Sequence, residues 1–315
     1  MCEILRSGRC ELFGLIDART NDTGLGFLAA LATVAIWASF LVSLRFAMVR
    51  DYSQGAVLLM RFLPAALLLA PVIWRTGLRP KGVPGWQILV IVLGSGVPFY
   101  FMISLGLSLA SATDAGVMAP GTLPLLIAVA SYLILGERFS GSRILGFALI
   151  LGGGLMIGLW EAVFAAGEGA WRGHLVIVSA VSGWALYTVI FRLSSLSALE
   201  GAAVSVGWST LLVVPFSLAI GVSTGGAPWE EIAMVAFIQG VLGGAAALIT
   251  FGMAVRMIGA SRTAALTALT PVTVLVAGVA FLGEPLDMIK IAGVVVVSAG
   301  VFLASGVLAE LRGRR

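Results

Sequence analysis

The stretch "LILGERFSGSRILG" (133–146) ends an apolar run abruptly at a glycine followed by a glutamate. A second stretch, "FLGEPLDMIKIAG" (281–293), ends another apolar run with the same Gly-Glu pair, 147 residues later. Glycine often ends a helix because it adopts left-handed backbone angles without strain, and a carboxylate is favoured near the start of a helix. We therefore predict two equivalent helix–turn–helix segments, in which Glu137 and Glu284 serve as helix caps or gating contacts.

The composition indicates that lipid is the solvent of this chain. Of 315 residues, 60% are hydrophobic and only 11% are charged, whereas soluble proteins carry about 25% charged residues. Hydrocarbon leaves exposed backbone polar groups unsatisfied, so the spans are helices. The sequence predicts an all-α membrane protein with ten transmembrane helices, one at 55–74 and nine in runs without Asp, Glu, Lys or Arg: 23–44, 82–113, 115–136, 144–160, 173–191, 201–229, 232–255, 263–283 and 291–309.

The charged residues predict how the chain faces the membrane. Fourteen of the 19 Lys and Arg residues fall in the two tails and in the linkers after the second, fourth, sixth and eighth predicted helices. Cytoplasmic segments carry such an excess, so we expect an inner-membrane protein with both termini in the cytoplasm. The net charge of +4 then needs no nucleic-acid partner. Cys2 and Cys10 are read as incidental thiols, and the glycosylation sequon at Asn21 as silent.

An internal duplication organises the chain. At a shift of 147 residues several distinctive residues coincide, namely Trp37 with Trp184, Arg45 with Arg192, Pro124 with Pro271, Gly146 with Gly293 and Gly153 with Gly300. Five helices per half is an odd number, so the second half enters the membrane from the opposite side. We predict two inverted-topology five-helix repeats at 25–162 and 172–308, between a cytoplasmic tail at 1–24 and a basic cytoplasmic tail at 309–315.

These features resemble the EamA-type members of the drug/metabolite transporter superfamily. The resemblance rests on Pro124 followed by Leu135-Gly136-Glu137, on Pro271 followed by Leu282-Gly283-Glu284, and on the glycine-rich helix after each motif. It covers roughly residues 25–308. The resemblance implies a secondary transporter that exports amino acids or similar small metabolites by alternating access, through a midplane cavity between the repeats.

Helices that contain Pro and Gly offer polar groups to a solute, because each proline removes a backbone donor and leaves a carbonyl free. Such stretches are "GSGVPFYF" (94–101), "MAPGTLP" (118–124) and "TAALTALTP" (263–271). Ordinary bends in a helical bundle are the alternative explanation. The candidate cavity residues from these stretches and from the eighth helix are Tyr100, Met118, Thr122, Thr250, Thr267 and Thr270.

Two mid-span tryptophans occupy equivalent repeat positions, unlike the others, which lie near span ends. Trp37 and Trp184, with Phe40 and Tyr187 about one turn further on, could hold an aromatic or cationic solute by stacking. Plain packing between helices explains them equally well.

Charged residues within the spans are functional candidates, because burying a charge in a bilayer is costly. Arg61 could bind a substrate carboxylate, snorkel outward or form a structural ion pair. Asp114 could bind an ammonium group or a proton, or cap its helix as a gating or structural contact. His174, the sole histidine, is expected at the membrane interface. The sequence does not favour Arg61 over Asp114, and it lacks a pair of mid-span carboxylates for proton transfer.

No enzyme motif has its required context. "GVSTG" (221–225) matches a nucleophile pattern, but it ends a membrane helix rather than following a strand. The sequence contains no metal cluster, P-loop or dinucleotide fingerprint, so we expect no catalytic residues, no metal and no cofactor. A passive channel and a membrane-embedded enzyme remain the alternatives. The expected partners are a small-molecule substrate and the lipid bilayer, for a monomer or a homodimer.

Overall fold

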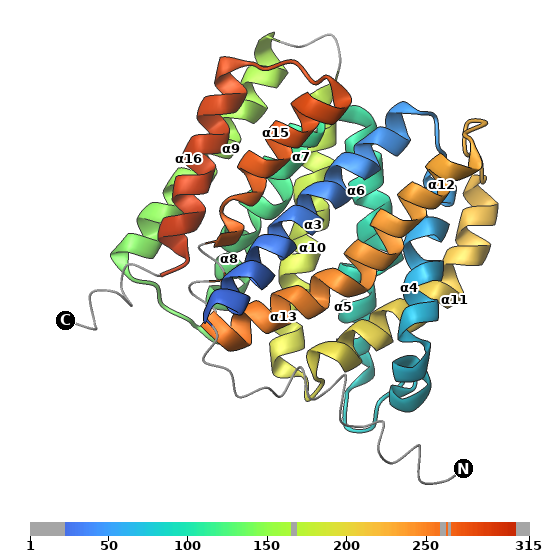
Figure 1. Cartoon of the computed structure of the whole chain (residues 1–315). Helices are drawn as coiled ribbons and strands as arrows, with labels where there is room; N and C mark the ends of the chain where they lie inside the picture. Colours follow the sequence, from blue (N-terminus) through green and yellow to red (C-terminus); the bar gives the residue numbers. More distant parts are fainter. Residues whose placement is uncertain (1–22, 165–168, 259–262, 264–265, 307–315) are drawn as a thin grey trace.

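The computed structural model describes residues 23–164, 169–258, 263 and 266–306. All regular elements in these segments are helical (Figure 1), which confirms the predicted all-α class. Cys2, Cys10, Asn21 and the basic residues of both tails lie outside the described residues.

Within the described residues, eight helices are long and apolar enough to cross a membrane. They comprise α3 (Thr23–Val49), α4 (Gln54–Thr76), α5 with α6 (Gly85–Ser95, Val97–Leu109), α7 with η1 and α8 (Ala112–Gly116, Val117–Gly121, Leu123–Leu135), α9 (Gly141–Phe164), α10 (Ala170–Leu193), α11 (Ala198–Ile220), and α12 with η2 and α13 (Trp229–Ala236, Phe237–Ala246, Ala247–Ile258). The last two predicted spans correspond to shorter apolar helices, α15 (Thr270–Leu282) and α16 (Met288–Ala304). A turn at residues 268–269, just before Pro271, shortens α15.

Two of the predicted stretches that contain Pro and Gly, 94–101 and 118–124, interrupt their helices in the structure. Gly96 separates α5 from α6 with extended backbone angles (φ −104°, ψ −152°). Pro120 lies within η1, a π-helical turn, and a second π-helix, η2, interrupts the long helix that starts at Trp229. Such wider turns are frequent at functional sites.

The two Gly-Glu turns have the same local geometry. Gly136 ends α8 at φ 67° and Gly283 ends α15 at φ 65°, both in the left-handed region. Each glycine N–H donates to a carbonyl in the last turn of the preceding helix. The predicted glycine stop is confirmed at both positions.

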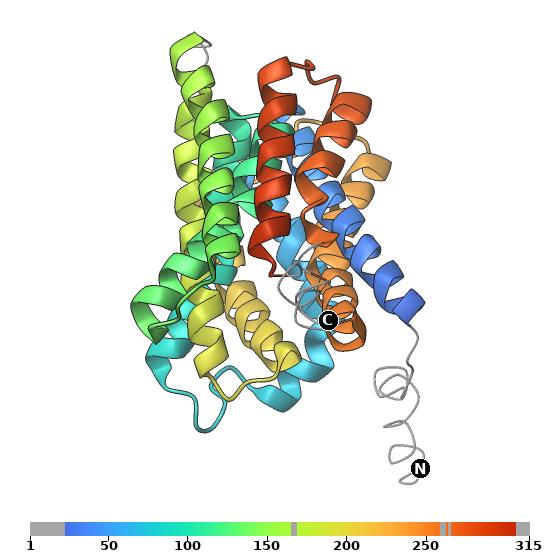
Figure 2. The same cartoon turned by 90° about the vertical axis from the view of Figure 1, so that its left-hand side faces the viewer.

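Packing joins the two predicted repeats helix by helix. Helix α9 packs on α16, α4 on α11, α3 on α13 and α15, and α10 on α6 and α8. In Figures 1 and 2 the linkers 77–84, 136–140 and 194–197 lie at the lower end of the molecule, whereas 50–53, 221–228 and 283–287 lie at the upper end. The two Gly-Glu turns are therefore at opposite ends of the bundle.

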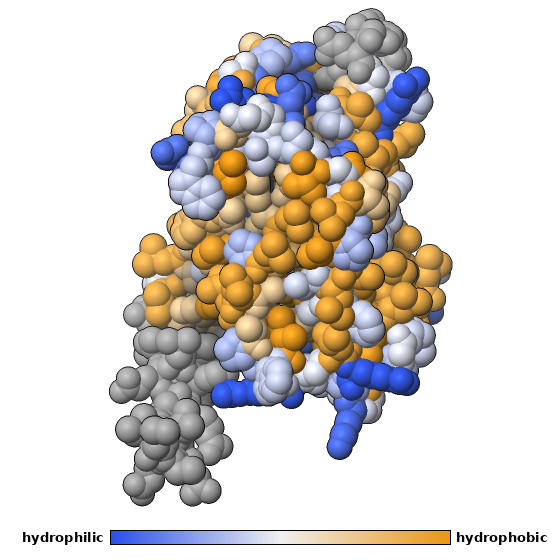
Figure 3. Space-filling view, turned by 90° about the vertical axis from the view of Figure 1, so that its right-hand side faces the viewer, coloured by the Kyte–Doolittle hydropathy of each residue, from blue (hydrophilic) through white to orange (hydrophobic). Residues whose placement is uncertain are grey.

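The surface has the polarity expected of a membrane protein. Figure 3 shows an apolar band between two more polar ends. Trp74, Trp86 and Trp229, which lie at the ends of their helices, are exposed. Such rings are typical of the boundary between hydrocarbon and water.

The α9–α16 contact gives a direct test of the packing. A Cβ atom added to Gly146 would lie 2.5 Å from the backbone nitrogen of Ala304, whereas Gly152 of the same helix has open space around it. We expect Gly146→Val to lower the free energy of unfolding by about 1–3 kcal/mol, as overpacking does. Chemical denaturation in detergent micelles measures this, with Gly152→Val as the control. Equal losses for the two variants would contradict the close approach.

Candidate functional site

Arg61 lies at the centre of a buried group formed by both halves of the chain. We call this group, with Phe40 of α3, Tyr100 of α6, and Gln239 and Gly243 of η2, the Arg61 cluster. Arg61 is only 8% exposed. Its guanidinium donates hydrogen bonds to the Tyr100 hydroxyl and to the backbone oxygens of Gln239 and Gly243, the latter at 3.2 Å. Arg61 is therefore held inside the bundle and does not snorkel toward the surface.

Aromatic rings surround the guanidinium. The Arg61 Cζ atom lies 5.1 Å from the ring centre of Phe40 and 4.2 Å from that of Tyr100. Such contacts stabilise a cation where water is excluded. Phe99 connects these rings to Trp184. The ring centroids of Phe99 and Trp184 are 4.7 Å apart, and those of Trp184 and Tyr187 are 5.5 Å apart. Five predicted cavity residues are thus brought into one contiguous set: Phe40, Arg61, Tyr100, Trp184 and Tyr187.

Gln239 is a member of the cluster that the sequence reading missed. It is 1% exposed, and its Nε2 donates to the Phe40 carbonyl at 3.0 Å and to the Ser43 hydroxyl at 2.7 Å. These bonds tie η2 to α3. A signal was present, since Gln239 is the only amide or charged side chain in the run 232–255.

The other predicted cavity residues lie apart from this cluster. Trp37 stacks on Phe251 with centroids 5.7 Å apart. Thr250 accepts a hydrogen bond from Thr33 at 2.8 Å. The remaining four candidates lie in or beside η1 and near the start of α15: Met118, Thr122, Thr267 and Thr270. Thr270 is fully buried and its hydroxyl has no hydrogen-bond partner among the described residues.

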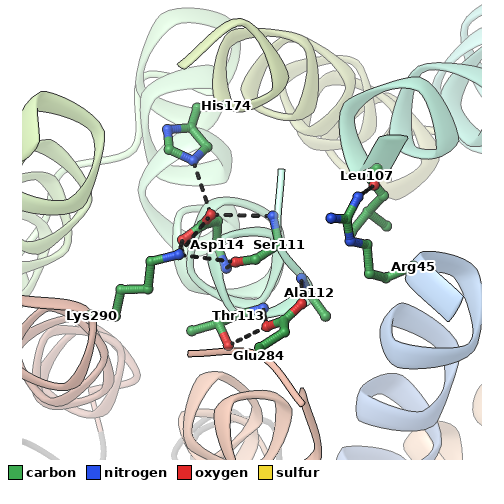
Figure 4. A network of polar contacts seen from close by, with 9 residues as sticks. All are labelled: Arg45, Leu107, Ser111, Ala112, Thr113, Asp114, His174, Glu284 and Lys290. Carbon is green, nitrogen blue, oxygen red and sulfur yellow. Dashed lines mark hydrogen bonds and ion pairs between the residues drawn. The ribbon is translucent and has the colours of Figure 1, made fainter. Parts of the chain in front are cut away.

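A second polar group, the Asp114 cluster, consists of Ser111, Asp114, His174 and Lys290 (Figure 4). Asp114 forms a capping box with Ser111 at the start of α7. Lys290 of α16 places Nζ 3.1 Å from Asp114 Oδ1, and His174 of α10 places Nε2 3.5 Å from Asp114 Oδ2. The Asp114 carboxylate therefore both caps α7 and pairs with a cation from the second half.

Two residues of this cluster have surroundings that the sequence did not reveal. His174, expected at the membrane interface, is only 4% exposed and packs beside Asp114. Lys290, which directly precedes the predicted run 291–309, is buried within α16. Its position between Ile289 and Ile291 was the available signal.

Glu284 caps a helix other than the one expected. Its carboxylate accepts hydrogen bonds from the backbone N–H groups of Ala112 (2.6 Å) and Thr113 (3.1 Å), at the start of α7. The following helix, α16, is capped by Asp287 instead. The carboxylate meets the positive end of the α7 dipole, so the Gly-Glu turn of the second half fastens onto the first half.

Two further ion pairs lie nearer the surface. Glu137 Oε1 is 3.0 Å from Arg192, and both side chains are substantially exposed. Arg50 and Tyr52 both bond to Glu231 of α12, at 2.9 and 3.0 Å. Burial, followed by the hydrogen bond to Glu231, raises the pKa of Tyr52 to about 12. The phenol therefore stays protonated at neutral pH and donates to Glu231.

Comparisons with known proteins agree with this architecture. The sequence profile of the EamA-like transporter family matches residues 24–159 and 171–306. The uncharacterized transporter YyaM of Bacillus subtilis (strain 168) is 29% identical over 259 residues, covering 78% of this chain and 82% of YyaM. YetK of the same strain, also an uncharacterized transporter, is 26% identical over 78% of this chain and 76% of its own. A crystal structure described only as that of a protein has the same fold, with a TM-score of 0.59 at 20% identity over 93% of this chain and 98% of the other.

The Asp114–Lys290 pair gives a test of the second cluster. We expect Lys290→Met to lower the free energy of unfolding by about 3–5 kcal/mol, because Asp114 loses its cation in a buried place. Asp114→Asn combined with Lys290→Met should cost less than the sum of the single changes. Chemical denaturation measures the cycle. As a control, Arg192→Gln, which breaks the exposed pair with Glu137, should lower the free energy of unfolding by about 0–1 kcal/mol. If the effects of Asp114→Asn and Lys290→Met simply add, the two residues are not coupled.

Proposed function

Because the chain belongs to the EamA-like transporter family, we propose that it is a secondary transporter that exports amino acids or similar small metabolites. One observation carries the proposal: the Arg61 cluster, a buried group of polar and aromatic side chains inside the apolar spans, shared between the two family repeats. Transporters bind their solutes at the interface between repeats. The solute would bind beside this cluster, in a cavity that opens alternately to either side.

The pairing of helices supports an inverted repeat of ten transmembrane helices. Equivalent helices pair with one another, as α4 does with α11 and α9 with α16. The contacts of α3 with α13 and α15 match those of α10 with α6 and α8. A pseudo-twofold axis in the membrane plane accounts for both patterns, and for the opposite placement of the two Gly-Glu turns (Figures 1 and 2).

Contacts between the halves close the upper end of the bundle. Glu284 caps α7, Lys290 pairs with Asp114, and Glu231 holds Arg50. In an alternating-access cycle these contacts break when this end opens. The conformation described here is then the one in which the solute enters from the lower end.

The lower end is proposed to face the cytoplasm. It contains a cavity of about 450 Å³ lined by Arg75, Arg79 and Lys81, and cytoplasmic segments are rich in such cations. This orientation places both termini in the cytoplasm, for a protein of the inner membrane. Solute would then enter from the cytoplasm and leave at the Asp114 side.

A passive channel and a membrane-embedded enzyme are the alternatives to the carrier function. A channel needs no alternating closure of its two ends, whereas contacts between the repeats join the helices at the upper end here. An enzyme would change its solute chemically. Counterflow in proteoliposomes separates all three, with a panel of amino acids and nucleobases. The carrier predicts saturable exchange of an unmodified solute, a channel predicts flux that does not saturate, and an enzyme predicts a changed product.

The aromatic path beside Arg61 gives a prediction for transport. We expect Trp184→Ala to lower the counterflow rate about tenfold, because lost ring contacts of about 0.5–2 kcal/mol weaken the hold on the solute. Trp37 lies apart from this path and stacks on Phe251; if it lines the cavity too, Trp37→Ala lowers transport while the protein stays folded. Trp74→Ala, whose ring is 90% exposed, is the control. Unchanged rates in both mid-span variants would contradict the cavity assignment.

A further inference from the structure

We propose that Arg61 binds the carboxylate of the transported solute, so that this carrier selects small carboxylates, including amino acids, over neutral solutes such as nucleobases. This inference rests on the proposed transport function and adds to it the chemical group that is recognised. It depends on three features of the Arg61 cluster: a charge without a counter-ion, unused donors, and adjacent rings.

The charge of Arg61 is not neutralised by a carboxylate from any described residue. Its hydrogen bonds go to a phenol and two backbone carbonyls. On the helices packed against α4, the carboxylates with assigned partners are engaged elsewhere, since Glu200 caps α11 and Glu231 pairs with Arg50. Burying an uncompensated cation in a membrane protein is costly. An anionic solute would supply the missing charge.

The guanidinium also has donors to spare. An arginine carries five N–H donors. The three hydrogen bonds from Arg61 to other described residues use one N–H of Nη1 and both of Nη2, which leaves the second N–H of Nη1 and the Nε N–H as donors for an incoming carboxylate. The three existing bonds hold the guanidinium in place before the solute arrives, so little side-chain entropy is lost on binding.

The backbone of η2 is shaped around this side chain. A Cβ atom at Gly243 would overlap the Nη1 atom of Arg61, so a side chain there would require the guanidinium to move. The backbone oxygens of Gln239 and Gly243 both point to the guanidinium from the π-helical segment. A residue at position 243 with any side chain would displace the guanidinium.

The aromatic rings near Arg61 indicate the chemistry of the rest of the solute. Phe40 and Tyr100 flank the guanidinium, and Phe99 continues from Tyr100 to Trp184. A solute whose carboxylate meets Arg61 would place its apolar part against these rings. The matching class is small carboxylates with an apolar or aromatic body, such as the larger amino acids.

Matched pairs of acids and amides test the inference on the purified full-length protein in detergent. The probes are L-phenylalanine with L-phenylalaninamide, L-leucine with L-leucinamide, and benzoate with benzamide; adenine is the nucleobase. Binding is measured by calorimetry for the wild type, Arg61→Gln, Arg61→Lys and Tyr100→Phe. Arg45→Gln, which removes a guanidinium bound to the Leu107 carbonyl, is the matched control. Thermal unfolding of each variant checks that it is folded.

We expect at least one acid to bind the wild type about 10- to 100-fold more tightly than its amide, as charge-assisted hydrogen bonds imply. Arg61→Gln should remove this preference, and Arg61→Lys should reduce it because an ammonium group cannot both make the three hydrogen bonds of the guanidinium and donate to the solute. Arg45→Gln should keep it. If Arg61→Gln does not fold, Arg61→Lys and Tyr100→Phe give the answer, since each retains most of the side chain.

The inference is overturned if amides bind as well as acids, if no acid binds, or if the acid preference survives in the folded Arg61 variants. Failure of the transport proposal is a separate result. Acid binding that depends on Arg61 but is not accompanied by counterflow would leave the recognition group intact and reject the carrier. Counterflow of adenine that is unaffected by Arg61→Gln would keep the carrier and reject the recognition group.

Discussion

The fold depends on one constraint: hydrocarbon cannot satisfy a polar group, so each polar group in the spans must find its partner within the protein. In this chain several of those partners come from the opposite repeat. Arg61 bonds to η2, Gln239 to α3, and Asp114 to α16. The same contacts that satisfy the buried polar groups therefore hold the two halves together.

The interruptions of the helices follow from the same constraint. A π-helical turn or a glycine break leaves carbonyl oxygens without their usual partner in the helix, and in lipid this is tolerated only where another group donates a hydrogen bond to them. The carbonyls of η2 meet Arg61, and Gly243 leaves room for it. The interrupted helical segments accordingly lie inside the bundle, where solute binding and a conformational change are both expected.

The sequence predicted the helical class, the glycine stops, the weak segments and the family. These depend on local chemistry: the Gly-Glu pairs, the prolines and the uncharged runs. It predicted that Phe40, Arg61, Tyr100, Trp184 and Tyr187 matter, but it did not reveal that they meet. The positions of His174, Lys290 and Glu284 depend on which helices of opposite halves lie side by side, and this pairing is tertiary information. Trp37 shows the limit of repeat arguments, since its partner Phe251 differs from the Phe99 that meets Trp184.

The central claim is that the two halves lie upside down relative to one another in the membrane. The most direct measurement is accessibility labelling of single cysteines placed at Arg138 and Asp287, in a chain with Cys2 and Cys10 replaced by alanine. Intact cells are treated with a membrane-impermeant thiol reagent. The account predicts that the cysteine at 287 is labelled from outside and that the cysteine at 138 reacts only after the membrane is opened. Labelling of both positions from the same side would contradict it.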